Sequence, residues 1–202
     1  MKKIIIWAVL IIATSPLKAQ QGTSEEKADL TTRIMVEIQN FMDYITIIGA
    51  AEESLEVRKR GIELCLKLFS SDAVIEEQSK NSSYKKPWTP EAYLQSMLYR
   101  GERSPVMVSF EVYDELLPEE LEMIEHEDGS ITYRGEMIFR QYYCKLKDIA
   151  RRKEPTAGAP EVNCEYSDYT DKKVAVVIKR DEDTRGKFWI TRISEIRVLR
   201  VF

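Results

Sequence analysis

Glu77 is the residue whose type and position best fit acid–base chemistry. Residues 73–78 read as a short strand, in which Glu77 shares one face with Ala73 and Ile75. A carboxylate that follows two apolar residues inward loses hydration, and this raises its pKa. A carboxylate with a pKa near neutrality can act as a general base. The alternative is a strand-end glutamate that reaches solvent or pairs with a lysine.

Four aromatic residues are candidates for the wall of a ligand pocket beside Glu77. They are Tyr44, Trp88, Tyr93 and Tyr133. Rings with a polar tip suit a ligand cavity, and they suit the edge of a core equally well. Tyr44 is also a weak candidate for the donor that would hold a developing enolate oxygen opposite the Glu77 base.

The three cysteines divide into one buried thiol and one candidate pair. Cys65 falls on the apolar face of an expected helix, where an inert thiol is ordinary. Cys144 and Cys164 flank a polar segment and are symmetric about Glu154. Strands that pair around Glu154 would make these two cysteines cross-strand neighbours, able to form a disulfide in an exported protein. The alternative is two unpaired thiols in an offset register.

Other chemistries lack the residues they need. The single histidine, His126, precedes an Asp128-Gly129 turn among acidic residues, but neighbours on a strand point to opposite faces and cannot all bind one ion. The chain has no C-x-x-C motif, no G-x-S-x-G motif and no glycine-rich phosphate loop. We therefore expect no metal site, no cofactor and no nucleophilic triad.

The elements that must position these residues are helical in the first half of the chain. Apolar residues at three- and four-residue steps predict a helix that begins after Thr23 and ends at Gly49. A second helix follows Ser54, and a third begins at Thr89-Pro90 and ends at Gly101.

The apolar period changes from 3.6 to 2 after Pro105. Alternating patterns predict a strand over residues 106–112, a hairpin that turns at Asp128-Gly129, and later strands over residues 174–179 and 188–201. The last strand loses phase near residues 191–195, which indicates a bulge. Together the patterns predict an α+β fold with three N-terminal helices packed on a curved antiparallel sheet.

This order of elements resembles the nuclear transport factor 2-like superfamily, the cystatin-like α+β cone. The passage LFSSDAVIE at residues 68–76 is similar to that family's transition from second helix to first strand, and Phe188-Trp189-Ile190 is similar to its last strand. The resemblance covers residues 28–202. It implies a sheet curled around the first helix with a pocket at the open end, in a superfamily that includes isomerases, dehydratases, cyclases and non-catalytic members.

The resemblance also bears on Glu77. In steroid-isomerase-like members, the residue at this offset is the carboxylate base. This chain has Glu where Asp is usual and Gln78 where proline is usual, and no second acid can be placed for the oxyanion.

The N-terminus predicts export. Residues 1–19 combine two early lysines, an apolar run over residues 4–13 and a small residue at Ala19, which is typical of a secretory signal peptide and too short to span a bilayer. Cleavage there would remove three lysines and no acid, lowering the net charge from −4 to −7. We expect a periplasmic or secreted protein whose residues 20–202 form a single α+β cone domain, and the resemblance implies an exported bacterial member of the superfamily.

Charge and surface residues limit the partners. The basic runs at residues 58–60 and 151–153 lie among glutamates and are interpreted as solvated, so nucleic acid is not an expected partner. No membrane span is expected in the mature chain. Met107, Tyr113 and Tyr142 suggest a homodimer through the outer face of the sheet.

Three functions remain open at this point. The leading hypothesis is an exported, non-catalytic protein that binds a small apolar or amphipathic ligand in a cone-shaped pocket. The first alternative is a lyase or isomerase that uses a pocket carboxylate as base. The second is a structural partner of envelope proteins, which would show an exposed apolar patch on the sheet.

Overall fold

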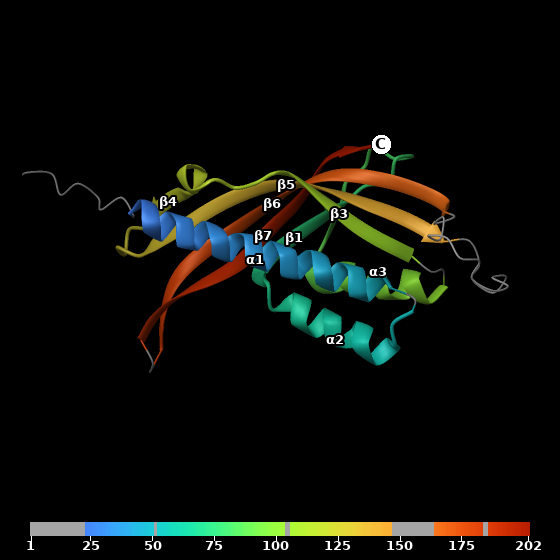
Figure 1. The fold of residues 1–202 in the computed structure, drawn as a ribbon, viewed down its shortest axis with the longest axis horizontal. Coiled ribbons are helices and arrows are strands. Elements are labelled where there is room, and N and C mark those ends of the chain that lie inside the picture. Colours follow the sequence, from blue (N-terminus) through green and yellow to red (C-terminus); the bar gives the residue numbers. More distant parts are fainter. Residues whose placement is uncertain (1–22, 51, 104–105, 147–163, 184–185) are drawn as a thin grey trace, which may run out of the picture.

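Three helices lie on one side of a curled sheet, as Figure 1 shows. The computed structural model describes residues 23–50, 52–103, 106–146, 164–183 and 186–202. The helices are α1 (Ser24–Gly49), α2 (Leu55–Leu66) and α3 (Pro90–Arg103). The expected α+β class is confirmed. The predicted signal peptide and the loop around Glu154 lie outside the described residues.

Each helix begins at the polar residue that the sequence predicts. The side-chain oxygen of Thr23 accepts a hydrogen bond from the Glu26 amide at 3.1 Å. Ser54 and Thr89 cap α2 and α3 in the same way, at 3.3 Å in both cases. These caps satisfy amides that have no partner within the helix, and they fix where each helix starts.

The sheet has seven strands in the described part of the chain. Its order is β2-β1-β7-β6-β5-β3, and β4 pairs with the first half of β5. The strands are β1 (Phe69–Glu77), β2 (Lys86–Trp88), β3 (Val106–Asp114), β4 (Glu122–Glu125), β5 (Ile131–Leu146), β6 (Cys164–Asp183) and β7 (Gly186–Val201). A single turn of 3-10 helix, Pro118–Glu120, precedes β4.

One strand pair departs from the expected antiparallel pattern. β1 runs parallel to β7, while every other pair is antiparallel in the part of the sheet that the structure describes. The connection between β1 and β7 contains α3 and the rest of the sheet, so no hairpin sets their relative direction.

The core lies between α1 and the inner face of the sheet. Phe41 of α1 contacts three rings from three strands, with centroid separations of 5.8 Å to Phe69, 6.3 Å to Phe110 and 6.3 Å to Phe139. Gly135 of β5 permits the close approach of α1, because a Cβ there would lie 3.0 Å from Ile34 Cδ1 of that helix and 2.5 Å from Leu116 Cδ2. The helix therefore packs against several strands at once, which favours a sheet that curls around it.

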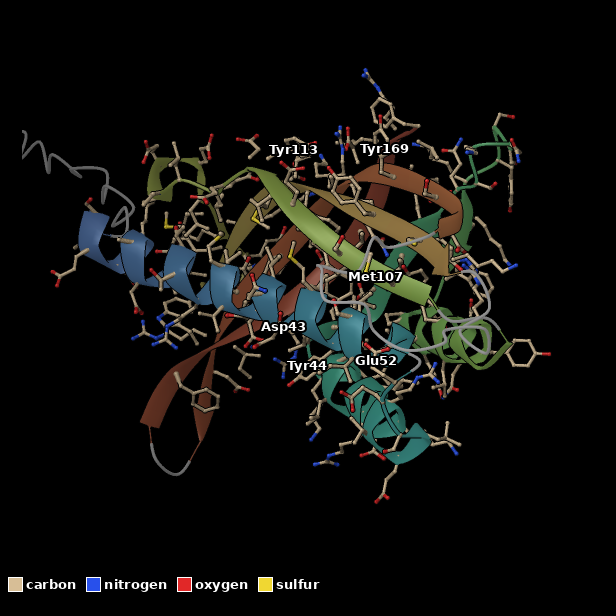
Figure 2. All side chains as sticks on the ribbon, turned by 45° about the vertical axis from the view of Figure 1, so that its right-hand side comes forward. Asp43, Tyr44, Glu52, Met107, Tyr113 and Tyr169 are labelled. Atoms are coloured by element: carbon tan, nitrogen blue, oxygen red, sulfur yellow. The ribbon has the colours of Figure 1, made fainter. Side chains whose placement is uncertain are left out.

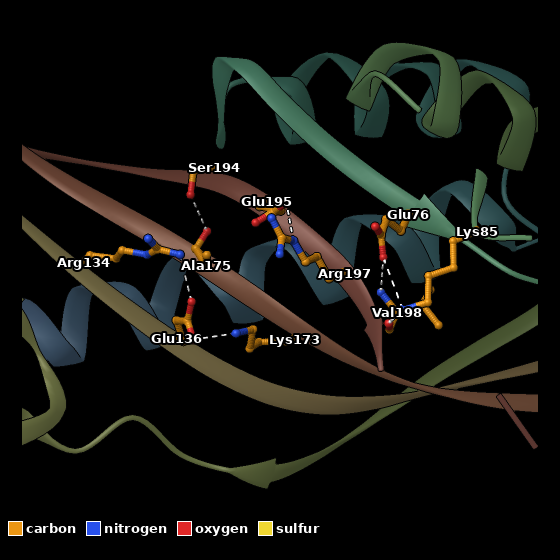
Figure 3. Close-up of polar contacts among 10 residues, drawn as sticks. All are labelled: Glu76, Lys85, Arg134, Glu136, Lys173, Ala175, Ser194, Glu195, Arg197 and Val198. Carbon is orange, nitrogen blue, oxygen red and sulfur yellow. Dashed lines mark hydrogen bonds and ion pairs between the residues drawn. The ribbon is translucent and has the colours of Figure 1, made fainter. Parts of the chain in front are cut away.

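The predicted bulge in the last strand and the predicted hairpin at Asp128-Gly129 have different outcomes. The bulge in the last strand is confirmed: Ala175 pairs with Glu195 but Val176 pairs with Ile193, so Ser194 is the extra residue and donates to the Ala175 carbonyl at 3.1 Å (Figure 3). The hairpin at Asp128-Gly129 is wider than a two-residue turn. Its ends are joined by the His126 amide and the Ser130 carbonyl at 2.9 Å, and Gly129 has φ +77°.

The cysteines occupy an offset register. The β5–β6 ladder places Cys144 opposite Ser167 and Cys164 opposite Leu146, so the strands do not pair around Glu154 and the two cysteines are not directly opposite. Cys144 is nevertheless disulfide-bonded, which agrees with the predicted pairing and excludes a free thiol at this position. The Cys164 side chain lies outside the described residues. Cys65 is a free buried thiol, as expected, and burial raises its pKa to about 12.

Arg58 joins the three helices to one another. It was expected to be solvated, but its side chain is only 4% exposed. Its Nε donates to the Ile48 carbonyl of α1 at 2.8 Å, and its Nη2 donates to the Leu98 carbonyl of α3 at 2.9 Å. The arginine therefore satisfies buried carbonyls at the meeting point of α1, α2 and α3.

We predict that Arg58→Met lowers the free energy of unfolding by about 2–4 kcal/mol, since it leaves two buried carbonyls without these donors. Urea unfolding measures this loss. The matched control is Arg60→Met on the same helix, where an exposed ion pair with Glu63 is lost and the expected change is within about 0.5 kcal/mol. Equal losses in the two variants would contradict the assigned role of Arg58.

Candidate functional site

An open cavity of about 490 Å³ lies where the end of β1 meets α3 and the inner faces of β5 and β6. Its wall includes Glu77, Tyr93 and Arg100 on one side, and Gln141, Tyr143 and Lys172 on the sheet. This volume falls in the range of small-molecule sites. The wall combines aromatic side chains with several polar groups.

Glu77 is paired with an arginine that the sequence analysis did not single out. Glu77 is the last residue of β1, and Arg100 lies near the end of α3. Arg100 Nη1 donates to Glu77 Oε1, and Nη2 donates to Oε2 at 2.9 Å. Both carboxylate oxygens are therefore engaged by one planar guanidinium, the geometry that arginine favours.

This pairing reverses the expected pKa of Glu77. Burial is the largest single influence and raises the pKa, but the hydrogen bonds and charge of Arg100 act in the opposite direction, with smaller help from Lys172 and Trp88. Together these groups leave the pKa of Glu77 below its usual range. The prediction of a raised pKa is wrong, because it considered desolvation without the arginine that the fold brings to the carboxylate.

Three polar residues on the inner face of the sheet face the cavity while being nearly buried. Gln141 of β5 lies opposite Thr170 of β6, and Lys172 follows two residues along the same face. Their exposed fractions are 8%, 8% and 5%. Among the described residues, none of the three side chains makes a hydrogen bond, and the nearest aromatic neighbour of Lys172 is the Tyr93 ring, 5.4 Å from its Nζ.

A sequence signal exists for two of these three residues, Thr170 and Lys172. The alternation of Val174, Val176 and Ile178, extended toward the N-terminus, places Lys172 and Thr170 on the same inward face. The sequence analysis began this strand at residue 174. A strand extended back to residue 170 would have predicted that Thr170 and Lys172 face the inner side of the sheet, where the cavity lies.

The five predicted site residues do not form one group. Glu77 and Tyr93 line the cavity. Trp88 lies opposite Ile75 beside it, and its buried indole N–H has no partner in hydrogen-bonding geometry although its dipole acts weakly on Glu77. Lys86 Nζ stands 3.5 Å from the centre of the Trp88 ring.

Tyr44 and Tyr133 lie elsewhere, and their assignment to this pocket is corrected. Tyr44 lines a shallow cavity with Val57 and Gly61 of α2, on the helical side of the molecule (Figure 2). Tyr133 is buried against Trp189 at 5.6 Å. It lies ten residues, or about 30 Å, along β5 from Tyr143. Tyr44 therefore does not stand opposite Glu77 as a donor.

Metal-binding residues do not gather in the described ranges. No group of three or more His, Cys, Asp or Glu side chains there could hold an ion. His126 is exposed beside its hairpin, and its Nε2 lies 2.8 Å from Thr132 Oγ1. No helix within the described ranges combines the length and apolar character needed to cross a membrane.

Comparison with known proteins gives distant structural similarities only. No family model and no curated protein sequence matches the chain. ActVI-ORFA from Streptomyces coelicolor is 13% identical with a TM-score of 0.38, covering 84% of this chain and 96% of that one. A periplasmic fragment of TraM is 8% identical with a TM-score of 0.39, over 81% and 96%. The benzoate 1,2-dioxygenase β subunit from Burkholderia mallei is 11% identical with a TM-score of 0.34, over 81% and 88%. Similarity at this level assigns no activity.

We predict that Glu77→Gln lowers the free energy of unfolding by about 1–2 kcal/mol at pH 7, because it removes the charge that pairs with Arg100. The loss is smaller than for a fully buried pair, because both side chains are partly exposed to solvent. Because the folded protein lowers the pKa of Glu77, the advantage of the native residue is fully present above the ordinary carboxyl pKa of 4.5 and declines as the pH falls through the folded value. Urea unfolding at pH 7 and pH 3 measures both quantities.

A double-mutant cycle with Arg100→Met isolates the pair from other effects of each substitution. We expect Glu77→Gln to cost little in the Arg100→Met background. A cost that is the same in both backgrounds, or that does not change with pH, would contradict the assigned coupling.

Proposed function

We propose that this protein is a non-catalytic binding protein that holds a small organic ligand in the cavity beside the Glu77–Arg100 pair. The observation that carries the proposal is the row of three nearly buried polar side chains, Gln141, Thr170 and Lys172, which face the cavity without a hydrogen bond to any described residue. Their polar atoms are not fully enclosed, since Trp88 Nε1 is the one fully buried, unpartnered polar side-chain atom among the described residues, and they can therefore bond to whatever occupies the open cavity. A ligand with complementary groups would supply those bonds.

The structure gives less support to the lyase or isomerase alternative. Both oxygens of Glu77 accept hydrogen bonds from Arg100, and its pKa lies below the usual carboxyl range. A base of this kind gains little driving force for removing a carbon-bound proton. Tyr44, the candidate donor, lies in a different cavity.

The proposal includes export. A secretory signal peptide at residues 1–19 would deliver the domain to the periplasm or the cell exterior. A soluble carrier or sensor of small molecules in that compartment fits a domain with an open pocket beside Glu77 and a net negative mature charge.

We predict that the neutral fluorescent probe N-phenyl-1-naphthylamine binds the protein, with a fluorescence increase, in the micromolar range typical of an unoptimised ligand. Thr170→Trp places a large side chain in the cavity and should weaken binding at least about tenfold. Ser109→Trp, on the exposed face of β3, is the matched control and should bind as the native protein does. Absence of binding by the native protein, or unchanged binding by Thr170→Trp, would overturn the proposal.

A second function is favoured by the outer face of the sheet. Arg140 is surrounded there by the rings of Tyr113, Tyr169 and Phe202, at 4.5, 4.6 and 5.0 Å from their centres, and it forms a two-point ion pair with Asp171. Tyr113 and Tyr169 lie on the side away from α1 (Figure 2). We name Tyr113, Arg140, Tyr142, Tyr169 and Phe202 the outer aromatic cluster.

This cluster supports the proposal of a homodimer through the outer face. Tyrosine and arginine are the residue types that interfaces favour at their centres. Acids and bases also alternate across the adjoining strands, where Glu136 accepts from Arg134 at 2.9 Å and from Lys173 at 2.8 Å (Figure 3). A surface with interspersed charges of both signs can complement a second copy of itself around a two-fold axis.

We predict that sedimentation velocity at about 50 µM, well above a micromolar dissociation constant, shows a dimer. Tyr113→Ser should shift the species toward monomer. The control is Tyr99→Ser on α3, which removes a ring of similar exposure from another face and should leave the dimer intact. Detection of monomer only for the native chain would argue against this surface.

A further inference from the structure

We propose that the ligand of the cavity is an organic anion whose oxyanion group, such as a carboxylate, binds at Lys172 next to Gln141 and Thr170. This inference rests on the proposed binding function and specifies its ligand class. Three independent features lead to it: the distribution of charge in the cavity, the hydrogen-bonding capacity of the buried row, and the apolar character of the opposite wall.

The charge in the cavity is not balanced at Lys172. Arg100 is neutralised by both oxygens of Glu77. The Lys172 ammonium is on a side chain that is 95% buried, and it makes no hydrogen bond among the described residues. Lys145 and Asp168, which also line the cavity, each interact with other groups. Within the described ranges, Lys172 is therefore a cation of the cavity for which no protein group acts as hydrogen-bond acceptor.

Most of the Lys172 side chain is buried, but its ammonium is not among the fully enclosed polar atoms of the described residues, so it opens on the cavity where a ligand can reach it. The Glu77 carboxylate acts on it only through space, and its own oxygens are taken by Arg100. The Tyr93 ring stabilises the cation weakly at 5.4 Å. An oxyanion at Lys172 would provide both the opposite charge and the missing acceptor.

Gln141 and Thr170 add donors on the same surface. They are directly opposite one another in the β5–β6 ladder, and each side chain carries a donor that has no partner among the described residues. A carboxylate is acceptor-only and has two oxygens, so it can accept from an ammonium and from a neighbouring amide or hydroxyl together. A neutral ligand would leave the ammonium without its counter-charge, and a cation would be repelled.

The opposite wall indicates that the anion has an organic body. Tyr93 and Met97 of α3 lie across the cavity from the buried row, and Tyr143 lies beside Gln141 on the same face of β5. Aromatic and thioether side chains gain by covering apolar surface, which an inorganic ion does not offer. The site therefore fits an amphipathic anion with an aromatic or aliphatic part.

The test compares two probes that differ only in the head group, 4-phenylbutyrate and 4-phenylbutan-1-ol, by their displacement of N-phenyl-1-naphthylamine from the full-length protein. We expect the native protein to bind the carboxylate at least about tenfold more tightly than the alcohol, as a charge-assisted hydrogen bond would give. Lys172→Met keeps the length of the side chain and removes its charge. It should abolish this preference while the alcohol still binds.

Two controls separate the head-group contact from general charge and from folding. Lys86→Met removes a cation from the exposed rim of the same cavity, and it should retain the preference for the carboxylate. Lys172→Arg keeps the charge and should also retain the preference. Circular dichroism melting curves report whether each variant is folded. If Lys172→Met does not fold, Lys172→Gln replaces it in the same comparison.

The outcomes distinguish this inference from the function on which it rests. Equal binding of the two probes by the native protein, or a preference that survives loss of the Lys172 charge, overturns the anionic ligand and leaves the binding function standing. A native protein that binds neither these probes nor N-phenyl-1-naphthylamine overturns both. A carboxylate preference that disappears in Lys172→Met and persists in Lys86→Met supports both.

Discussion

The two-point pair between Glu77 and Arg100 is the interaction on which the site depends. It ties the last residue of β1 to α3, and so holds the helix over the open end of the sheet where the cavity lies. It also decides the chemistry. A free Glu77 would have been available as a base, and a free Arg100 would have added a second uncompensated cation. With the two neutralising each other, Lys172 is left as a largely buried cation of the cavity whose ammonium has no hydrogen-bond acceptor in the part of the chain that the structure describes.

The helical layer that carries Arg100 is itself held by a buried arginine. Arg58 bonds to carbonyls in α1 and α3 from its position in α2, so the three helices share one polar contact within an apolar core. Arginine suits this role because its several donors lie in one plane and remain protonated at any physiological pH. The two arginines differ in their surroundings. Arg58 is buried between the helices, whereas Arg100 lines a cavity that is open to solvent.

The two faces of the same strands have separate roles because side chains alternate along a strand. On β5, Phe139 and Gln141 face the helices, while Arg140 and Tyr142 face outward. The inner face changes from apolar to polar along its length, which forms first the core and then the cavity. The outer face carries the aromatic cluster and the alternating charges of Figure 3. A ligand site and a protein surface can therefore coexist on one sheet without sharing residues.

The sequence by itself determined the local features: the helix caps at Thr23, Ser54 and Thr89, the α+β order, the bulge near Ser194 and the inward phase of Glu77, all of which depend on neighbours within a few residues. Tertiary structure decided which of these residues meet. Arg100 is 23 positions from Glu77, and Tyr44 and Tyr133 differ from Tyr93 only in where their elements pack. Periodicity specifies the face on which a side chain lies, but not the partner opposite that face. The pKa of Glu77 depends on that partner, and so its direction followed from the fold rather than from the strand pattern.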